Sequence, residues 1–129
     1  MSLIMVVDDN QGVLELIKNI FSPMGYQVIT ANNGAAALKK LTAIPKPDLI
    51  LTDYCMPLIN GSELIERLAG DNRFSDIPIL VITGSLIDLI KLPSTPNYSG
   101  CIKKPFEITN ILSIVNTIIH QKSSIDSAV

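Results

Sequence analysis

Five short aliphatic runs alternate along the chain with segments of helical periodicity. The runs cover residues 3–9, 26–31, 48–53, 77–84 and 100–104. Short runs rich in β-branched residues predict strands, and the near-continuous Ile, Leu and Val content of the fourth run predicts a strand covered on both faces. Because strands and helices alternate, right-handed crossovers bring the strands into one parallel sheet. We therefore expect a three-layer α/β sandwich with five strands.

The segments between and after these runs carry the predicted helices. We expect five helices, within residues 10–25, 34–43, 62–70, 85–92 and 105–122. The last has the clearest three-to-four spacing of apolar residues, whereas 85–92 is long enough for about two turns only. Asn32 or Asn33 is the expected N-cap of the second helix, since Asn is a preferred capping residue.

Length and composition indicate a single domain. A chain of 129 residues with 47% hydrophobic content can close one core, and we expect it to span 3–121, followed by a flexible tail at 122–129. The apolar runs are far shorter than the roughly 18 residues of a membrane-spanning helix, and no leader is recognised. The expected location is the cytoplasm, without a membrane partner.

Charge and cysteine content exclude two further classes. The formal net charge is −2 and the lysines form no stripe, so direct nucleic-acid binding is not expected. Cys55 and Cys101 lack metal-ligand spacing and are expected to be reduced thiols.

The predicted strands end in residues that carry chemistry. In order along the chain these are Asp8, Asp9, Asp53, Thr83, Lys103 and Lys104. Ligands of open parallel sheets collect at the carboxyl ends of the strands, and in a flavodoxin-like strand order of 2-1-3-4-5 the three acids converge. Carboxylates 4 Å apart repel by roughly 4 kcal/mol per pair at an effective dielectric constant of 20. A hard cation such as Mg²⁺ would neutralise them and would let Asp53 attack phosphorus.

Four motifs resemble the receiver domain of bacterial two-component response regulators. They are VVDDN (6–10), DLILTDYCMP (48–57) with Gly61, ILVITG (79–84) and KPF (104–106), and the likeness covers about 3–121. It implies a signalling phosphoacceptor of a phosphorelay, which is not an enzyme. It further implies that Asp53 is the phosphoacceptor and that Asp8, Asp9, Asp53 and the backbone carbonyl of Cys55 hold Mg²⁺.

The same resemblance implies roles for two other strand ends. Thr83 would be the switch hydroxyl, and Lys104 would contact the phosphoryl group and precede a cis bond to Pro105. Strand alternation lets only one of Lys103 and Lys104 face the site, and Lys103 is taken as structural.

The phosphoryl group must come from a partner's histidine or from a small acyl phosphate, not from within this chain. The only histidine, His120, lies near the end of the last predicted helix and is not expected to be a phosphodonor. The expected partners are a sensor histidine kinase or histidine phosphotransfer protein and a downstream protein that the sequence does not identify. We expect a monomer or a weak dimer.

Two features depart from the family pattern. Many receivers carry an aromatic residue at the position of Cys101, whose ring moves inward when the threonine is drawn to the phosphoryl group. Cys101 lacks that bulk, so the readout is expected to be weaker or differently routed. Pro93 and Pro96 follow the predicted fourth helix and predict an altered partner surface.

Four other interpretations compete with this one. Asp8, Asp9 and Asn10 are good helix caps. A haloacid-dehalogenase-like phosphatase would need a second aspartate two residues after the first, where this chain has Cys55. A flavin or nucleotide carrier would need a Ser, Thr or Gly-rich loop after the first strand, which instead reads DDNQG. A receiver-shaped module that binds partners without phosphorylation is kept open by Cys101.

Overall fold

All five predicted strands are present in one sheet. The computed structural model describes residues 2–84 and 92–128, with side chains described up to residue 121. The strands are β1 Leu3–Val7, β2 Gln27–Ala31, β3 Leu49–Asp53, β4 Ile79–Thr83 and β5 Tyr98–Lys103. The helices are α1 Gln11–Phe21, α2 Gly34–Leu41, α3 Gly61–Ala69 and α4 Ile108–Ala128, with a 3₁₀ turn η1 at Ser22–Met24.

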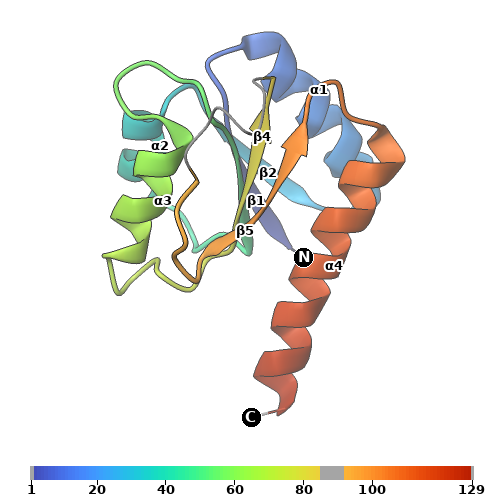
Figure 1. Cartoon of the computed structure of the whole chain (residues 1–129). Helices are drawn as coiled ribbons and strands as arrows, with labels where there is room; N and C mark the ends of the chain where they lie inside the picture. The colour runs from blue at the N-terminus through green and yellow to red at the C-terminus, as the bar shows by residue number, and fades with distance from the viewer. Residues whose placement is uncertain (1, 85–91, 129) are drawn as a thin grey trace.

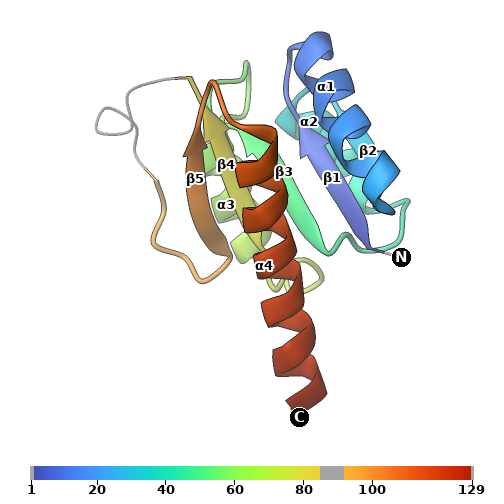
Figure 2. The same ribbon diagram turned by 90° about the vertical axis from the view of Figure 1, so that its right-hand side faces the viewer.

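The sheet is parallel throughout and has the strand order β2-β1-β3-β4-β5. Helices α1 and α4 cover one face, and α2 and α3 cover the other (Figures 1 and 2). The predicted three-layer sandwich and strand order are therefore confirmed. The predicted count of five helices differs from the four α-helices among the described residues, because the helix expected at 85–92 falls almost wholly on residues 85–91, which lie outside them.

Each face of the sheet has its own hydrophobic cluster. Alternate residues of β1 serve the two faces: Met5 and Val7 pack toward α2 and α3, whereas Ile4 and Val6 pack toward α1 and α4. These four side chains are at most 1% exposed. Burying one such side chain contributes roughly 1.5–3 kcal/mol, so apolar residues predominate on both faces of the central strands. This burial explains the aliphatic runs in the sequence.

Three helices begin with an asparagine cap at the carboxyl edge of the sheet. Asn10 Oδ1 accepts from Val13 N at 3.2 Å, Asn33 Oδ1 accepts from Ala36 N at 2.7 Å, and Asn60 Oδ1 accepts from Glu63 N at 2.8 Å. Each cap contributes about 1 kcal/mol. Asn33, not Asn32, therefore caps α2, and Asn10 caps α1.

Helix α4 continues as helix past residue 121, the predicted end of the domain, and projects beyond the sheet (Figure 1). The boundary at 121 and the flexible tail at 122–129 stay predictions. Among the described residues no helix combines the length and the apolar content needed to cross a lipid bilayer.

Candidate functional site

The carboxyl edge of the sheet gathers three carboxylates. Val7 of β1 lies opposite Thr52 of β3, so the acids that follow them, Asp8 and Asp53, reach the same edge. One oxygen each of Asp8, Asp9 and Asp53 lies within 4.8 Å of the others. Asp8 is 2% exposed and Asp53 8% exposed, whereas Asp9 is exposed to solvent. The acids that the sequence singled out are therefore brought together.

Lys104 supplies a positive charge to this cluster. Its Nζ lies 3.1 Å from Asp8 Oδ2 and 3.5 Å from Asp53 Oδ1. The lysine is held in place by its backbone, because Lys104 N donates to the Thr83 carbonyl at 2.7 Å. The Lys104–Pro105 peptide bond is cis, as the resemblance implied.

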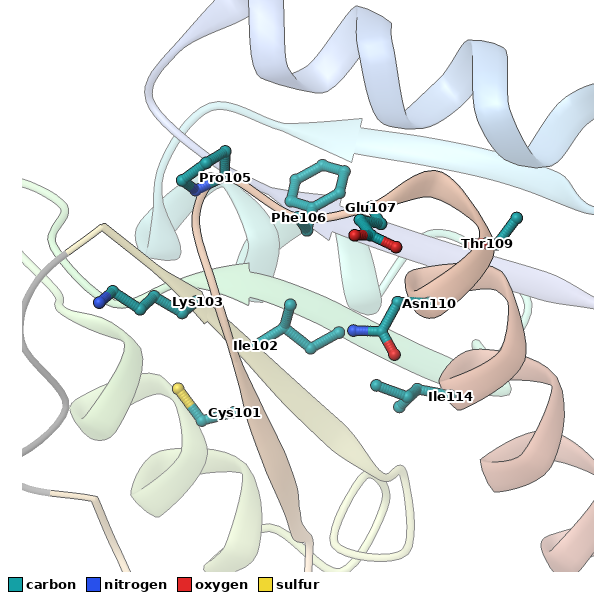
Figure 3. Close-up of a pocket in the computed structure, with 9 residues that line it drawn as sticks. All are labelled: Cys101, Ile102, Lys103, Pro105, Phe106, Glu107, Thr109, Asn110 and Ile114. Carbon is teal, nitrogen blue, oxygen red and sulfur yellow. The ribbon is translucent and has the colours of Figure 1, made fainter.

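Lys103 points elsewhere. Figure 3 shows Lys103 and Cys101 on one side of the β5 ribbon and Ile102 on the other, toward α4. Lys103 lines a shallow cavity of about 710 Å³ beside β5 and α4, which none of the three acids lines. Strand alternation thus separates the two lysines, and the one before proline faces the acids.

Burial and charge act in opposite directions on these groups. Burial raises the pKa of Asp53, the charge of Asp8 raises it further, and Lys104 only partly offsets both. Burial lowers the pKa of Lys104, but its hydrogen bond to Asp8 and the charges of Asp53 and Asp8 outweigh burial and raise it. The carboxylate of Asp53 is therefore destabilised in its charged form and gains from any further cation.

The backbone around Asp53 is held by three contacts. Tyr54 N donates to the Ile82 carbonyl at 3.1 Å, and Gly61 N donates to the Tyr54 carbonyl at 2.8 Å. Gly61 must lack a side chain, since an added Cβ would lie 2.8 Å from the Asp53 carbonyl oxygen. The third contact is the Thr52 hydroxyl, which donates to that same oxygen at 3.0 Å. Sequence reasoning missed Thr52, although a polar residue within a wholly buried aliphatic strand was a visible signal.

The remaining predicted residues lie at or near the same edge. Thr83 ends β4 and is 1% exposed, and Cys55 lies exposed in the turn after β3. Cys101 is half-buried opposite Val81, and burial raises the pKa of its thiol, which makes it a poor nucleophile. Within the described part of the chain, neither cysteine forms a disulfide.

Comparison with known proteins decides the family. A family model described as the response regulator receiver domain matches residues 4–116. The chain belongs to this family. Receiver domains are signalling phosphoacceptors of two-component systems, and this assignment favours neither the phosphatase nor the carrier interpretation.

Relatives of this receiver domain occur in proteins of very different length. One relative is hybrid signal transduction histidine kinase D of Dictyostelium discoideum, which is 32% identical over 123 residues. The match covers 95% of this chain and 8% of that protein. Another relative is chemotaxis protein CheY1 of Helicobacter pylori strain J99, which is 41% identical over 81 residues. That match covers 62% of this chain and 65% of CheY1. Thus the chain spans less than two thirds of either relative.

A solved structure resembles the receiver domain along most of both chains. The response regulator protein TrrA from Thermotoga maritima, in complex with Mg²⁺ and BeF, is 30% identical with a TM-score of 0.79. The match covers 92% of this chain and 99% of that chain.

Proposed function

We propose that this receiver domain accepts a phosphoryl group on Asp53 in a Mg²⁺-dependent reaction. One observation carries the proposal: a nearly buried carboxylate lies within 4.8 Å of two other carboxylates and 3.5 Å from an ammonium group. A carboxylate kept destabilised by burial and by a neighbouring acid is a reactive group held in place, which is what a nucleophile requires.

The donor set fits Mg²⁺. All three side chains offer hard carboxylate oxygens, and Lys104 alone leaves the cluster with net negative charge. Asp8, Asp9, Asp53 and the Cys55 backbone carbonyl would hold the ion. The similar TrrA structure, a complex with Mg²⁺ and BeF, supports the choice of metal.

In the proposed reaction an Asp53 carboxylate oxygen forms a bond to phosphorus. The bond between phosphorus and the donor breaks at the same time: a P–N bond if the donor is a phosphohistidine, or a P–O bond if it is an acyl phosphate. The donor keeps the electron pair of that bond, as imidazole or as a carboxylate. When bound, the metal supplies positive charge to the transferring oxygens.

Residues of this chain would hold the product. The Lys104 ammonium, already between Asp8 and Asp53, would move little to reach a phosphoryl oxygen on Asp53. Thr83 ends the neighbouring strand and would donate its hydroxyl to another phosphoryl oxygen. Its movement would carry the signal to β5, where Cys101 offers less bulk than an aromatic residue.

The phosphodonor would be a protein partner. His120 is exposed on α4 near Ser2 and Met24, which lie at the amino-terminal side of the sheet, away from the acids. A sensor histidine kinase or a phosphotransfer protein is the expected donor, and one matched relative is a hybrid histidine kinase. A cytoplasmic location, an altered partner surface at Pro93 and Pro96, and a monomeric or weakly dimeric state remain part of this proposal.

The test is intact-mass measurement after incubation with acetyl phosphate, with and without Mg²⁺. Wild-type protein should gain one phosphoryl group only with Mg²⁺, whereas Asp53→Ala should gain none. Asp71→Ala is the matched control, because Asp71 is a surface acid paired with Arg73 and should leave labelling unchanged. Labelling of the Asp53 variant would assign the acceptor to another residue.

A further inference from the structure

Thr52 is the one polar side chain of β3 before Asp53, and it is fully buried. Leu49, Ile50, Leu51 and Thr52 are all 0% exposed. A buried hydroxyl costs free energy unless it makes a hydrogen bond, and the Thr52 hydroxyl makes one to the carbonyl oxygen of Asp53.

Folding alone does not call for a hydroxyl at this position. Valine has the same shape as threonine, an equal preference for strands and no polar atom to bury. The other buried β3 positions, Leu49 to Leu51, are aliphatic, as the packing of a central strand requires. The Thr52 hydroxyl therefore has a role that a purely structural strand residue does not have.

That role follows from the group it contacts. The Asp53 carbonyl belongs to the peptide that joins Asp53 to Tyr54, where the chain leaves the sheet. A change in ψ of Asp53 that is not compensated at Tyr54 would alter the direction of the Asp53 side chain relative to the carbonyl of Cys55, two residues further on. Gly61 restricts the same peptide sterically, since a Cβ there would lie 2.8 Å from the Asp53 carbonyl oxygen and 3.0 Å from Tyr54 Cα.

We propose that Thr52 is a positioning residue for phosphorylation. Its hydroxyl holds the Asp53 carbonyl and so fixes the direction of the Asp53 carboxylate and the Cys55 carbonyl toward the metal and the phosphodonor. Thr52 touches neither of these, and it acts only through the backbone of Asp53. The inference rests on the proposed function, because phosphorylation of Asp53 is its main readout.

The test compares variants that differ by the hydroxyl. Thr52→Val keeps the shape and removes the hydroxyl, Thr52→Ser keeps the hydroxyl, and Thr52→Ala differs from the serine variant by that one oxygen. Thr30→Val is the matched control, because Thr30 is a half-buried threonine of β2, an edge strand, and pairs with Val6 of β1. Each variant is measured for its initial rate of labelling by acetyl phosphate, for Mg²⁺ affinity by calorimetric titration, and for its urea unfolding midpoint.

Loss of one hydrogen bond that orients the nucleophile should slow labelling about fivefold in T52V and weaken Mg²⁺ binding by a similar factor. T52S and T30V should stay within about twofold of wild type, by the same reasoning. The proposal would be overturned if a folded T52V had the labelling rate and Mg²⁺ affinity of wild type. It would also be overturned if T52S were labelled as slowly as T52V. If T52V does not fold, T52S and T52A are compared instead: slower labelling and weaker Mg²⁺ binding in T52A than in T52S would support the proposal, and equal values would overturn it.

The two proposals can fail separately. Wild-type labelling at Asp53 with no effect of T52V would remove the role of Thr52 alone. No labelling of wild-type protein would remove the proposed function, and the Mg²⁺ titrations of wild type and T52V would then decide whether Thr52 positions the acids.

Discussion

Replacing Lys104 by methionine tests the electrostatics of the site directly. Methionine keeps most of the length and apolar stem of lysine but removes the charge. Within the described part of the chain, Lys104 is the cation in contact with both Asp8, at 3.1 Å, and Asp53, at 3.5 Å. Without it, two nearly buried carboxylates would face each other with no lysine counterion between them. We therefore expect K104M to be less stable than wild type in EDTA at pH 8.

The distances set the size of the effect. At an effective dielectric constant of 20, each of the two contacts is worth about 5 kcal/mol of gross attraction. Desolvation of the ammonium offsets much of this, and removing one partner of a buried pair costs about 3–5 kcal/mol. The Lys104 side chain is 26% exposed, which favours the lower end, about 3 kcal/mol. With a urea m-value of about 1.5 kcal/mol/M, the unfolding midpoint should fall by about 2 M.

The pH dependence has a defined sign. Lys104 lowers the pKa of Asp53 against burial and Asp8, so K104M should raise that pKa further above its ordinary value of 3.8. A carboxyl group with a raised folded-state pKa stabilises the fold below its unfolded pKa, and this contribution is lost as the pH rises through the folded pKa. The difference between K104M and wild type should therefore be largest at pH 8 and should narrow on acidification, and saturating Mg²⁺ should also narrow it.

The difference in unfolding midpoint between K104M and wild type can be measured by urea unfolding followed by circular dichroism, at pH 8 and pH 5, with EDTA or with Mg²⁺. K103M is the matched control, because Lys103 is the adjacent lysine, is exposed, and among the described residues makes no ion pair. Equal midpoints for K104M and K103M in EDTA at pH 8 would refute the assignment of Lys104 as the counterion of the acids.

Two further predictions concern Asp53 and Gly61. Burial and the charge of Asp8 raise the pKa of Asp53 in the folded state, so the contribution of Asp53 to stability falls as the pH rises from 3.8 through the folded pKa. Asp53→Asn removes this pH dependence. Without metal, the urea unfolding midpoint of D53N relative to that of wild type should therefore increase between about pH 4 and pH 8. An unchanged difference across that range would contradict the raised pKa. Gly61→Ala should lower the free energy of unfolding in urea by about 1–3 kcal/mol, because the added Cβ would lie 2.8 Å from the Asp53 carbonyl oxygen. Gly70→Ala should lower it by less than about 1 kcal/mol, because the atoms nearest to its added Cβ lie 3.7 Å away. Similar losses of unfolding free energy in G61A and G70A would contradict the steric role of Gly61 beside Asp53.

The alternation of strands and helices was predictable from the sequence, because central strands of a parallel sheet need apolar side chains on both faces. The start of β5 was not. We expected it at Gly100, but the strand begins at Tyr98, and the pairs Ile79–Tyr98 and Val81–Cys101 show an irregular register. Gly100, with φ +127°, accommodates the extra residue. A sequence with Asn, Ser and Gly in that segment favours a turn, and only pairing with β4 makes it a strand.

The acids of the site were predictable for a similar reason, since they stand at the ends of two predominantly aliphatic runs. The contacts around the Asp53 carbonyl were not, because they depend on how closely α3 approaches the end of β3. In the sequence, Gly61 is only part of a motif and Thr52 is only one residue of a predicted strand. Their significance lies in one oxygen atom, the Asp53 carbonyl: the Thr52 hydroxyl lies 3.0 Å from it, and a Cβ added at Gly61 would lie 2.8 Å from it. No spacing along the chain encodes these distances.

The residues that balance charge at this edge come from distant parts of the chain. Lys104 lies 96 positions from Asp8 and 51 from Asp53. During folding, β1 and β3 can pair before β5 has joined the sheet, and at that stage the two acids repel without relief. Lys104 directly follows β5, an edge strand of the sheet, so the charge balance among these acids is complete only when β5 is paired with β4.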